Sequence, residues 1–226
     1  KTSGYQTESL GKVLHHQDDS PEGWSVPPWS AQDEVPRHLA TGFRNYQEPA
    51  NIAAFKEDGI GPATEAADVD DDAYFDGQTA ARAVVALERL AQNDQPFFLA
   101  VGFVKPHLPF TAPRKYWDLY DRDAIELARV RTMPEGIPSQ ASHSFGELRR
   151  YADVPDEPKV PIDDQLARKL KHGYYASASY ADAQVGRVLD KLEELELDSS
   201  TIVILVGDHG WSLGEHGLWA KHSPFD

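Results

Sequence analysis

Residues 201–226 read TIVILVGDHGWSLGEHGLWAKHSPFD, and the rest of the chain is best interpreted from this stretch. Its first six residues, Thr201 to Val206, are β-branched or apolar, which is typical of a strand buried on both faces of a sheet. The strand would end at Gly207, and Asp208 and His209 follow at once. Open α/β sheets place their sites in the loops at the carboxyl ends of strands, so the stretch predicts a functional site here.

The composition is that of a globular protein with an excess of acidic residues. Hydrophobic residues make up 40% of the 226 positions, and 22 basic against 37 acidic residues give a net charge of −15. This charge argues against nucleic acid or an anionic membrane as a partner, although a local basic pocket could still bind an anionic substrate. The chain has no cysteine, which excludes disulfides, thiolate metal sites and a cysteine nucleophile within these residues. The length predicts a single domain over residues 1–226.

Helices and strands are expected to alternate upstream of the last stretch. A helix begins at 76–79 and carries an apolar stripe, and the run PFFLAVGFV at 96–104 is typical of a buried strand. The longest helix falls within 163–197, where two glycines could bend it, and a strand over 9–15 is more weakly signalled. Helix followed by strand, repeated along the chain, indicates βαβ units, an α/β fold and a largely parallel sheet.

Two long segments, 17–76 and 121–161, are rich in residues that favour turns and are expected to be loops. The acidic run 68–72 favours a solvated loop with a helix N-cap over a calcium loop, because it lacks the glycine and the final glutamate of the EF-hand pattern. Aromatic residues are expected to anchor these loops to the body of the protein: Trp24, Trp29, Trp117 and Tyr151.

Charged and titratable side chains gather where the expected strands end: Lys12, His15, Lys105, His107, Asp208, His209 and Lys221. If the strands are parallel neighbours, these side chains converge on one edge of the sheet. That edge would carry an oxygen ligand, imidazoles and ammonium groups, which together can bind a tetrahedral oxyanion beside a divalent cation. Taken singly, each residue has a plainer interpretation as a surface lysine, a structural histidine or a loop cap. Glu215 and His216 are expected to hold the loop in place.

Four segments of the chain resemble the sulfatase family of the alkaline-phosphatase-like superfamily, and they look most like its iduronate-2-sulfatase branch. They are GYQTESLGKVLHH at 4–16, PFFLAVGFVKPHLPF at 96–110, YYASASYADAQVGRVLDKL at 174–192 and GDHGWSLGEHGLWAKHSPFD at 207–226. The last is the most specific, since Asp-His-Gly at a strand end followed by Gly-Glu-His-Gly and a lysine seldom arises by chance. The resemblance implies a three-layer sandwich whose largely parallel central sheet is flanked by helices.

The resemblance also implies a metal and a reaction. Asp208 and His209 would be ligands of a calcium ion, although hard oxygen ligands suit calcium better than imidazole does. The hydroxyl of a formylglycine would attack sulfur, the alcohol would leave, and the hemiacetal sulfate would return to the aldehyde. Positive charge from the cations and the metal would offset the charge that builds on the sulfate oxygens.

Four further residues match positions that hold the sulfate or the nucleophile in the family. Lys12 would contact both the sulfate and the formylglycine, and His15 would hold the gem-diol of that residue. His107 and Lys221 would bind the sulfate. Of these two, His107 is the better candidate to protonate the departing sugar oxygen.

Parts of the family's site have no match in this chain. The nucleophile lies in a Cys- or Ser-x-Pro-x-Arg motif upstream of the Gly-Tyr-x-Thr segment, and two more metal-binding aspartates come from an earlier strand. The family also has further sheet and a small C-terminal subdomain beyond the position of Asp226. We therefore expect a fragment that holds part of a catalytic site.

The resulting hypothesis is a sulfuric ester hydrolase that acts on a sulfated saccharide of the glycosaminoglycan kind, with a 2-O-sulfated uronic acid as one example. It would be periplasmic or secreted in a bacterium and lysosomal in a eukaryote. Two alternatives stay open: a phosphodiesterase or phosphonate hydrolase of the same superfamily, and a non-catalytic paralogue that binds sulfated glycans.

Overall fold

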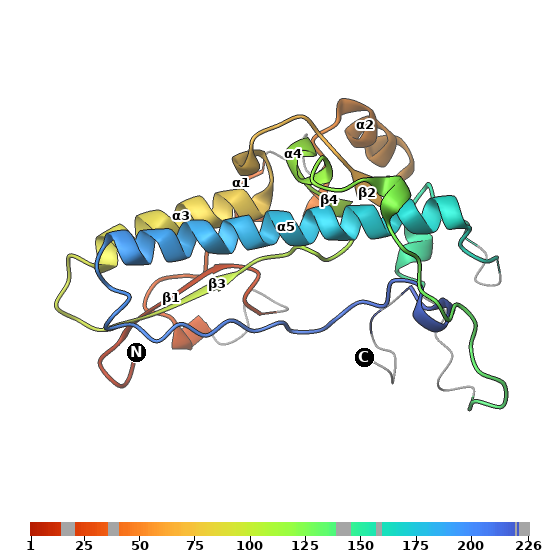
Figure 1. The fold of residues 1–226 in the computed structure, drawn as a ribbon. Coiled ribbons are helices and arrows are strands. Elements are labelled where there is room, and N and C mark those ends of the chain that lie inside the picture. Colours follow the sequence, from red (N-terminus) through yellow and green to blue (C-terminus); the bar gives the residue numbers. More distant parts are fainter. Residues whose placement is uncertain (15–20, 36–40, 139–145, 157–159, 220, 222–226) are drawn as a thin grey trace.

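The computed structural model describes residues 1–14, 21–35, 41–138, 146–156, 160–219 and 221, so His15 lies outside the described residues. Two long helices lie side by side above a pair of strands, and shorter elements gather at one end of the helix pair (Figure 1). The helices and strands are β1 (Gln6–Gly11), α1 (Ala31–Glu34), α2 (Pro49–Asp58), β2 (Thr64–Glu65), α3 (Phe75–Leu90), β3 (Phe97–Gly102), β4 (Phe110–Thr111), α4 (Arg114–Trp117) and α5 (Asp164–Glu194).

The strands pair in parallel, as the alternation of helices and strands predicts. β1 pairs with β3 from Gln6 opposite Phe97 to Gly11 opposite Gly102, and the short strands β2 and β4 form a second parallel pair. The run at 96–104 is thus confirmed as a strand, whereas the strand expected over 9–15 begins and ends earlier. Gly11 and Gly102 lie so close that a Cβ on Gly102 would be 2.1 Å from the backbone of Lys12. This close approach places Lys12 directly beyond the ends of both strands.

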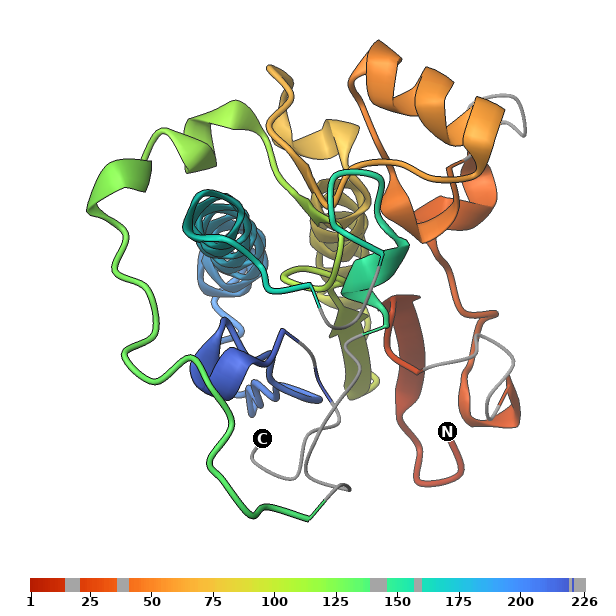
Figure 2. The same cartoon turned by 90° about the vertical axis from the view of Figure 1, so that its right-hand side faces the viewer.

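Helices α3 and α5 pack against each other, and Figure 2 shows both almost end-on, with α3 over the strands β1 and β3 and α5 beside α3. Helix α5 is continuous over 31 residues, or about 46 Å, and begins with the Asp163 side chain accepting a hydrogen bond from the Leu166 amide. Its glycines do not interrupt it. A Cβ on Gly173 would instead lie 2.8 Å from the Trp117 ring, so this glycine permits close packing. Ala176 and Ser177 are fully buried in the same way.

The expected aromatic anchors hold the loops to this body. Trp117 and Tyr151 are each 5% exposed and belong to two buried apolar clusters. Trp24 stacks on Phe98 with ring centroids 6.1 Å apart, and Trp29 forms a bridge with Leu10 of β1. None of the described helices is both long and apolar enough to cross a membrane.

The acidic run at 68–72 ties the loop before α3 to its neighbours. Asp71 accepts hydrogen bonds from the Tyr116 hydroxyl and the Gln184 amide, and Asp72 forms an ion pair with Arg187 at 2.6 Å. The expected N-cap is wrong, because the residue at that position is Tyr74, which makes no side-chain capping bond. Asp68, Asp70 and Asp72 are exposed, as expected for a solvated loop, while Asp71 and Asp72 contact α4 and α5.

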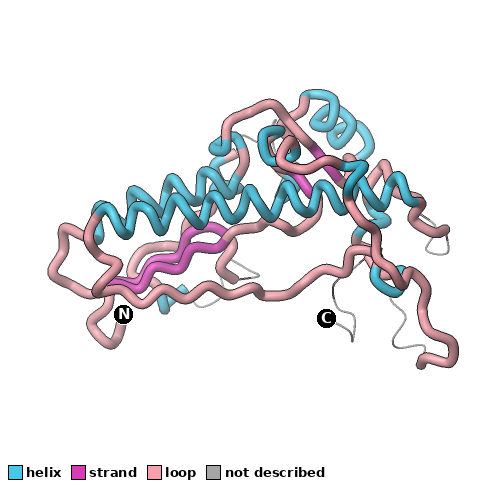
Figure 3. The backbone as a smooth tube through the Cα atoms, in the orientation of Figure 1, coloured by secondary structure: helices cyan, strands magenta, loops and turns pink. Residues whose placement is uncertain are grey.

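The predicted buried strand at Thr201–Val206 is not found. The segment is extended but pairs with no described strand, and Figure 3 shows it as a long loop below the sheet. Ile202, Ile204, Leu205 and Val206 are 76–89% exposed. Apolar, β-branched residues favour extended backbone, but burial depends on neighbouring strands and helices, which the described residues do not supply on either edge.

Candidate active site

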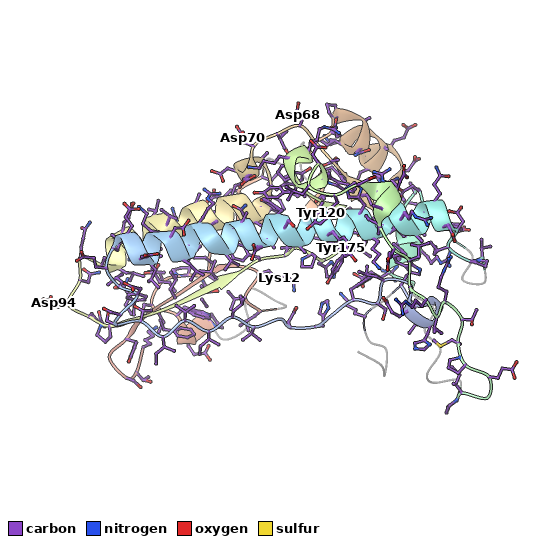
Figure 4. The ribbon with its side chains drawn as sticks, in the orientation of Figure 1. Lys12, Asp68, Asp70, Asp94, Tyr120 and Tyr175 are labelled. Carbon is purple, nitrogen blue, oxygen red and sulfur yellow. The ribbon has the colours of Figure 1, made fainter. Side chains whose placement is uncertain are left out.

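The charged residues beyond the strands form two close pairs. The Lys12 ammonium lies 3.6 Å from the Asp208 carboxylate, and the Lys221 ammonium lies 2.6 Å from Nε2 of His107. The His107 and His209 rings, with centroids 6.0 Å apart, join the pairs into one group. Figure 4 labels Lys12 near the end of the strand pair. The predicted convergence of these residues is therefore found even though the strand at 201–206 is absent.

Two buried charged side chains, Asp76 and Lys105, hold the loop that carries His107 through hydrogen bonds to its backbone. The Asp76 carboxylate, in the first turn of α3, accepts hydrogen bonds from the amides of Val104 and Lys105 at 2.9 and 2.8 Å. The Lys105 ammonium in turn donates to the Pro109 carbonyl at 2.6 Å. Burial lowers the pKa of Lys105 to about 8, against the opposing charge of Asp76, and burial raises the pKa of Asp76. The expectation that Lys105 lies on the exposed edge is wrong; it braces the loop from inside.

The backbone fixes the orientation of the His107 ring. Nδ1 lies 2.8 Å from the Leu108 carbonyl, which can only accept, so Nδ1 carries a proton. Nε2 is then the nitrogen that changes its state. In the neutral ring Nε2 accepts from Lys221, and in the protonated ring it donates to Glu147 Oε1 at 3.1 Å. The ring can therefore exchange a proton on the side that faces Lys221 and Glu147.

Glu147 is a member of the group that the sequence did not reveal. Its Oε2 lies 3.2 Å from the Lys221 ammonium, so the carboxylate contacts both the lysine and the His107 ring. Burial alone would raise the pKa of Glu147, but the hydrogen bond and charge of His107 together with Lys221 lower it to about 2. Glu147 is thus ionised at neutral pH. It lies in the segment interpreted as a loop, and no spacing or motif distinguishes it there.

Asp208 and His209 offer two donors suited to one cation. His209 Nδ1 lies 2.8 Å from the Gly210 carbonyl and so bears the proton, which leaves a lone pair on Nε2 in the neutral ring. That nitrogen is 3.9 Å from Asp208 Oδ2, a separation at which both can bind the same ion. Calcium takes about six to eight ligands, mostly oxygens. Within the described ranges no group of three or more His, Cys, Asp or Glu residues could hold a metal, and Asp208 and His209 alone supply fewer ligands than calcium takes.

The turn after His209 returns the chain to His107. The Glu215 carboxylate accepts a hydrogen bond from the Leu213 amide at 2.6 Å, and the His216 amide donates to the Val130 carbonyl at 2.8 Å. Gly214, with φ of 103°, closes the turn by donating to the Leu218 carbonyl. These bonds agree with the expected structural role of Glu215 and His216. They place Lys221 beside His107.

Comparison with known proteins identifies the family of the chain. The family model described as Sulfatase matches residues 1–226. The chain belongs to the sulfatase family. The chain is 39% identical to iduronate 2-sulfatase of Homo sapiens, over all of its own length and 42% of the relative's. It is 30% identical to choline-sulfatase of Rhizobium meliloti, over 80% of its length and 36% of that protein's.

Solved structures agree with the expected fold of the chain. The crystal structure of the phosphonate monoester hydrolase of Agrobacterium radiobacter matches all of this chain and 49% of that one, with a TM-score of 0.62 and 20% identity. The likeness shows an alkaline-phosphatase-like α/β fold. The chain spans less than half the length of the curated relatives named above.

Proposed function

We propose that these residues form the central part of an enzyme that hydrolyses sulfate esters of a saccharide, such as a 2-O-sulfated uronic acid. The observation that carries this proposal is the pairing of the His107 imidazole with the Lys221 ammonium at 2.6 Å, next to the Asp208–His209 pair. An oxyanion is the ligand that such a pair of donors suits best. The 39% identity to iduronate 2-sulfatase supports the choice of sulfate and of a saccharide.

Each cationic group has a separate task in this proposal. The Lys12 and Lys221 ammonium groups bind sulfate oxygens and offset the negative charge that develops as the ester bond breaks. His107, whose Nδ1 is held by the Leu108 carbonyl, delivers a proton from Nε2 to the departing sugar oxygen. His15, which lies outside the described residues, is proposed to hold the nucleophile.

The proposal needs two groups beyond the side chains described. Asp208 and His209 would hold a calcium ion, which when bound would supply positive charge beside the sulfate oxygens. The attacking hydroxyl would belong to a formylglycine in the longer protein. We also propose a periplasmic or secreted location in a bacterium, or a lysosomal one in a eukaryote.

The proposal is tested by comparing the full-length protein on a 2-O-sulfated uronate disaccharide and on the matching phosphate ester. We expect sulfate to be released at the higher rate. Faster release of phosphate would point to a phosphoester or phosphonate hydrolase. Binding of the disaccharide without release of either anion, together with a mass that shows no formylglycine, would point to a glycan-binding protein that lacks catalysis.

A further inference from the structure

Glu147 lies on the side of His107 that the proposed reaction needs. Its Oε1 is 3.1 Å from His107 Nε2, and its Oε2 is 3.2 Å from the Lys221 ammonium. The three side chains are 15–33% exposed, so they form a compact, partly solvated group. One carboxylate thus engages the imidazole and the ammonium that are proposed to bind sulfate.

A carboxylate that merely orients a catalytic histidine occupies a different position. It binds the ring nitrogen remote from the substrate and so fixes the ring and its tautomer. In this protein the Leu108 carbonyl already does so, through Nδ1 of His107. Glu147 faces Nε2, the nitrogen that would meet the substrate. An orienting role therefore does not explain where Glu147 lies.

Carboxylate and sulfate compete for the same kind of donor. Both are oxyanions whose oxygens accept charge-assisted hydrogen bonds from ammonium and imidazolium groups at about 2.7–3.2 Å. The two Glu147 oxygens engage His107 and Lys221 at 3.1 and 3.2 Å, much as two oxygens of a sulfate group would. A sulfate bound to the same donors would meet a second negative charge at close range, so Glu147 has to withdraw for the sulfate to bind.

We propose that Glu147 is an internal counter-anion of the sulfate site: it occupies His107 and Lys221 in the free protein and is displaced by the sulfate group. The inference rests on the proposed function, because it assigns sulfate to these two donors. As a consequence, the protein binds every ligand that carries a sulfate group more weakly, including the inorganic sulfate released by the reaction. Glu147 thereby favours release of the product and reduces its inhibition of the enzyme.

The test is direct binding of inorganic sulfate to the full-length protein by calorimetry, which requires no turnover. Glu147→Gln keeps the shape of the side chain and removes its charge, and Glu147→Ala removes the whole group. We expect both variants to bind sulfate about tenfold more tightly than the unmodified protein, a change of about 1.4 kcal/mol in binding free energy. Competitive inhibition by sulfate should strengthen by the same factor.

Glu135→Gln is the matched control, because it removes one negative charge from an exposed position of the loop at 131–138. It should leave sulfate affinity unchanged, and an equal gain in this variant would overturn the inference by showing an effect of net charge alone. Equal or weaker sulfate binding in both Glu147 variants, or no binding by any of the proteins, would also overturn it. Tighter binding in a protein that hydrolyses no sulfate ester would instead support the counter-anion and reject the proposed function.

Discussion

His107 and Asp208 each follow an apolar run of the chain, yet the surroundings of the two residues differ sharply. His107 extends from a loop that Asp76 and Lys105 brace from a buried position, and its own ring is tied to the backbone. Asp208 follows a segment whose apolar side chains are exposed, and its own side chain is 72% exposed. One part of the site is therefore fixed by packing within the described residues, while the other is held mainly by charged contacts.

This difference teaches which part of the chemistry depends on fold stability. A side chain held by buried polar groups loses its position when those groups are changed, and the protein loses stability with it. An exposed carboxylate can be changed with little loss of stability, so its contribution to function can be measured separately. The predictions below use this contrast, from the largest expected change in stability to the smallest.

Asp76→Asn should destabilise the part of the site around His107, which is fixed by packing. The change removes the largest negative charge acting on the buried Lys105 ammonium, although Glu65 still acts on it, and weakens the two backbone hydrogen bonds that Asp76 accepts. We expect the free energy of unfolding to fall by about 3–5 kcal/mol, because two hydrogen bonds to a charged acceptor are each worth about 1.5–3 kcal/mol. Urea denaturation measures this loss. A decrease below about 1 kcal/mol would mean that the brace does not hold the His107 loop.

The pH dependence of stability should report Lys105. Its pKa is lowered from 10.5 to about 8 in the folded protein, so the unfolded chain binds the additional proton between these values. Stability contributed by this group therefore rises as the pH increases from about 8 to 10.5, by up to about 3 kcal/mol at 1.36 kcal/mol per pKa unit. The free energy of unfolding is measured across this pH range for the unmodified protein and for Lys105→Met, and the difference between the two gives the contribution of Lys105. A parallel pH dependence in the two proteins would exclude the assignment.

Glu147 should also change the pH dependence of stability, by a smaller amount and at acidic pH. Its pKa is lowered from 4.5 to about 2, so its stabilising contribution is complete above about 4.5 and is lost as the pH falls towards 2. Because the side chain is 33% exposed, screening should reduce this contribution to about 1 kcal/mol. Comparison with Glu147→Gln by thermal unfolding between pH 5 and pH 2 measures it. Identical acid dependence of the two proteins would argue against the ion pairs of Glu147.

Asp208→Asn should have the smallest effect on stability and a large effect on function. In calcium-free protein we expect the free energy of unfolding to change by less than about 0.5 kcal/mol, because the carboxylate is exposed. Calcium binding, followed by calorimetry on the full-length protein, should weaken about tenfold or more when this ligand is lost. Unchanged calcium affinity would remove Asp208 from the proposed metal site.

Strong apolar periodicity made the elements around His107 predictable. Helices α3 and α5 and strand β3 all carry such patterns, and each lies where its pattern indicates. Helix α2 was missed because none of its residues is buried, so it has no apolar stripe to detect. Its ends did carry signals, since Pro49 begins the helix and Gly59 ends it in the left-handed conformation.

The candidate site was predictable only where a motif marked it. Lys12, His107, Asp208 and Lys221 lie in segments that resemble a known family, and the structure brings these residues together. Glu147 reaches the same place through the path of a long loop, which no local pattern records. The burial expected for Thr201–Val206 failed for a related reason, because burial depends on neighbouring elements as well as on the segment's own sequence.

The most direct test of the account is a double-mutant cycle on His107→Ala and Lys221→Ala, with kcat/KM for a 2-O-sulfated uronate disaccharide measured in the full-length protein. Each single change should lower kcat/KM about 10²–10⁴-fold, and the double variant should lose much less than the product of the two, because both residues act on one sulfate group. Lys56→Ala, on an exposed face of α2, should leave the rate unchanged. Unchanged turnover in both single variants would contradict the account.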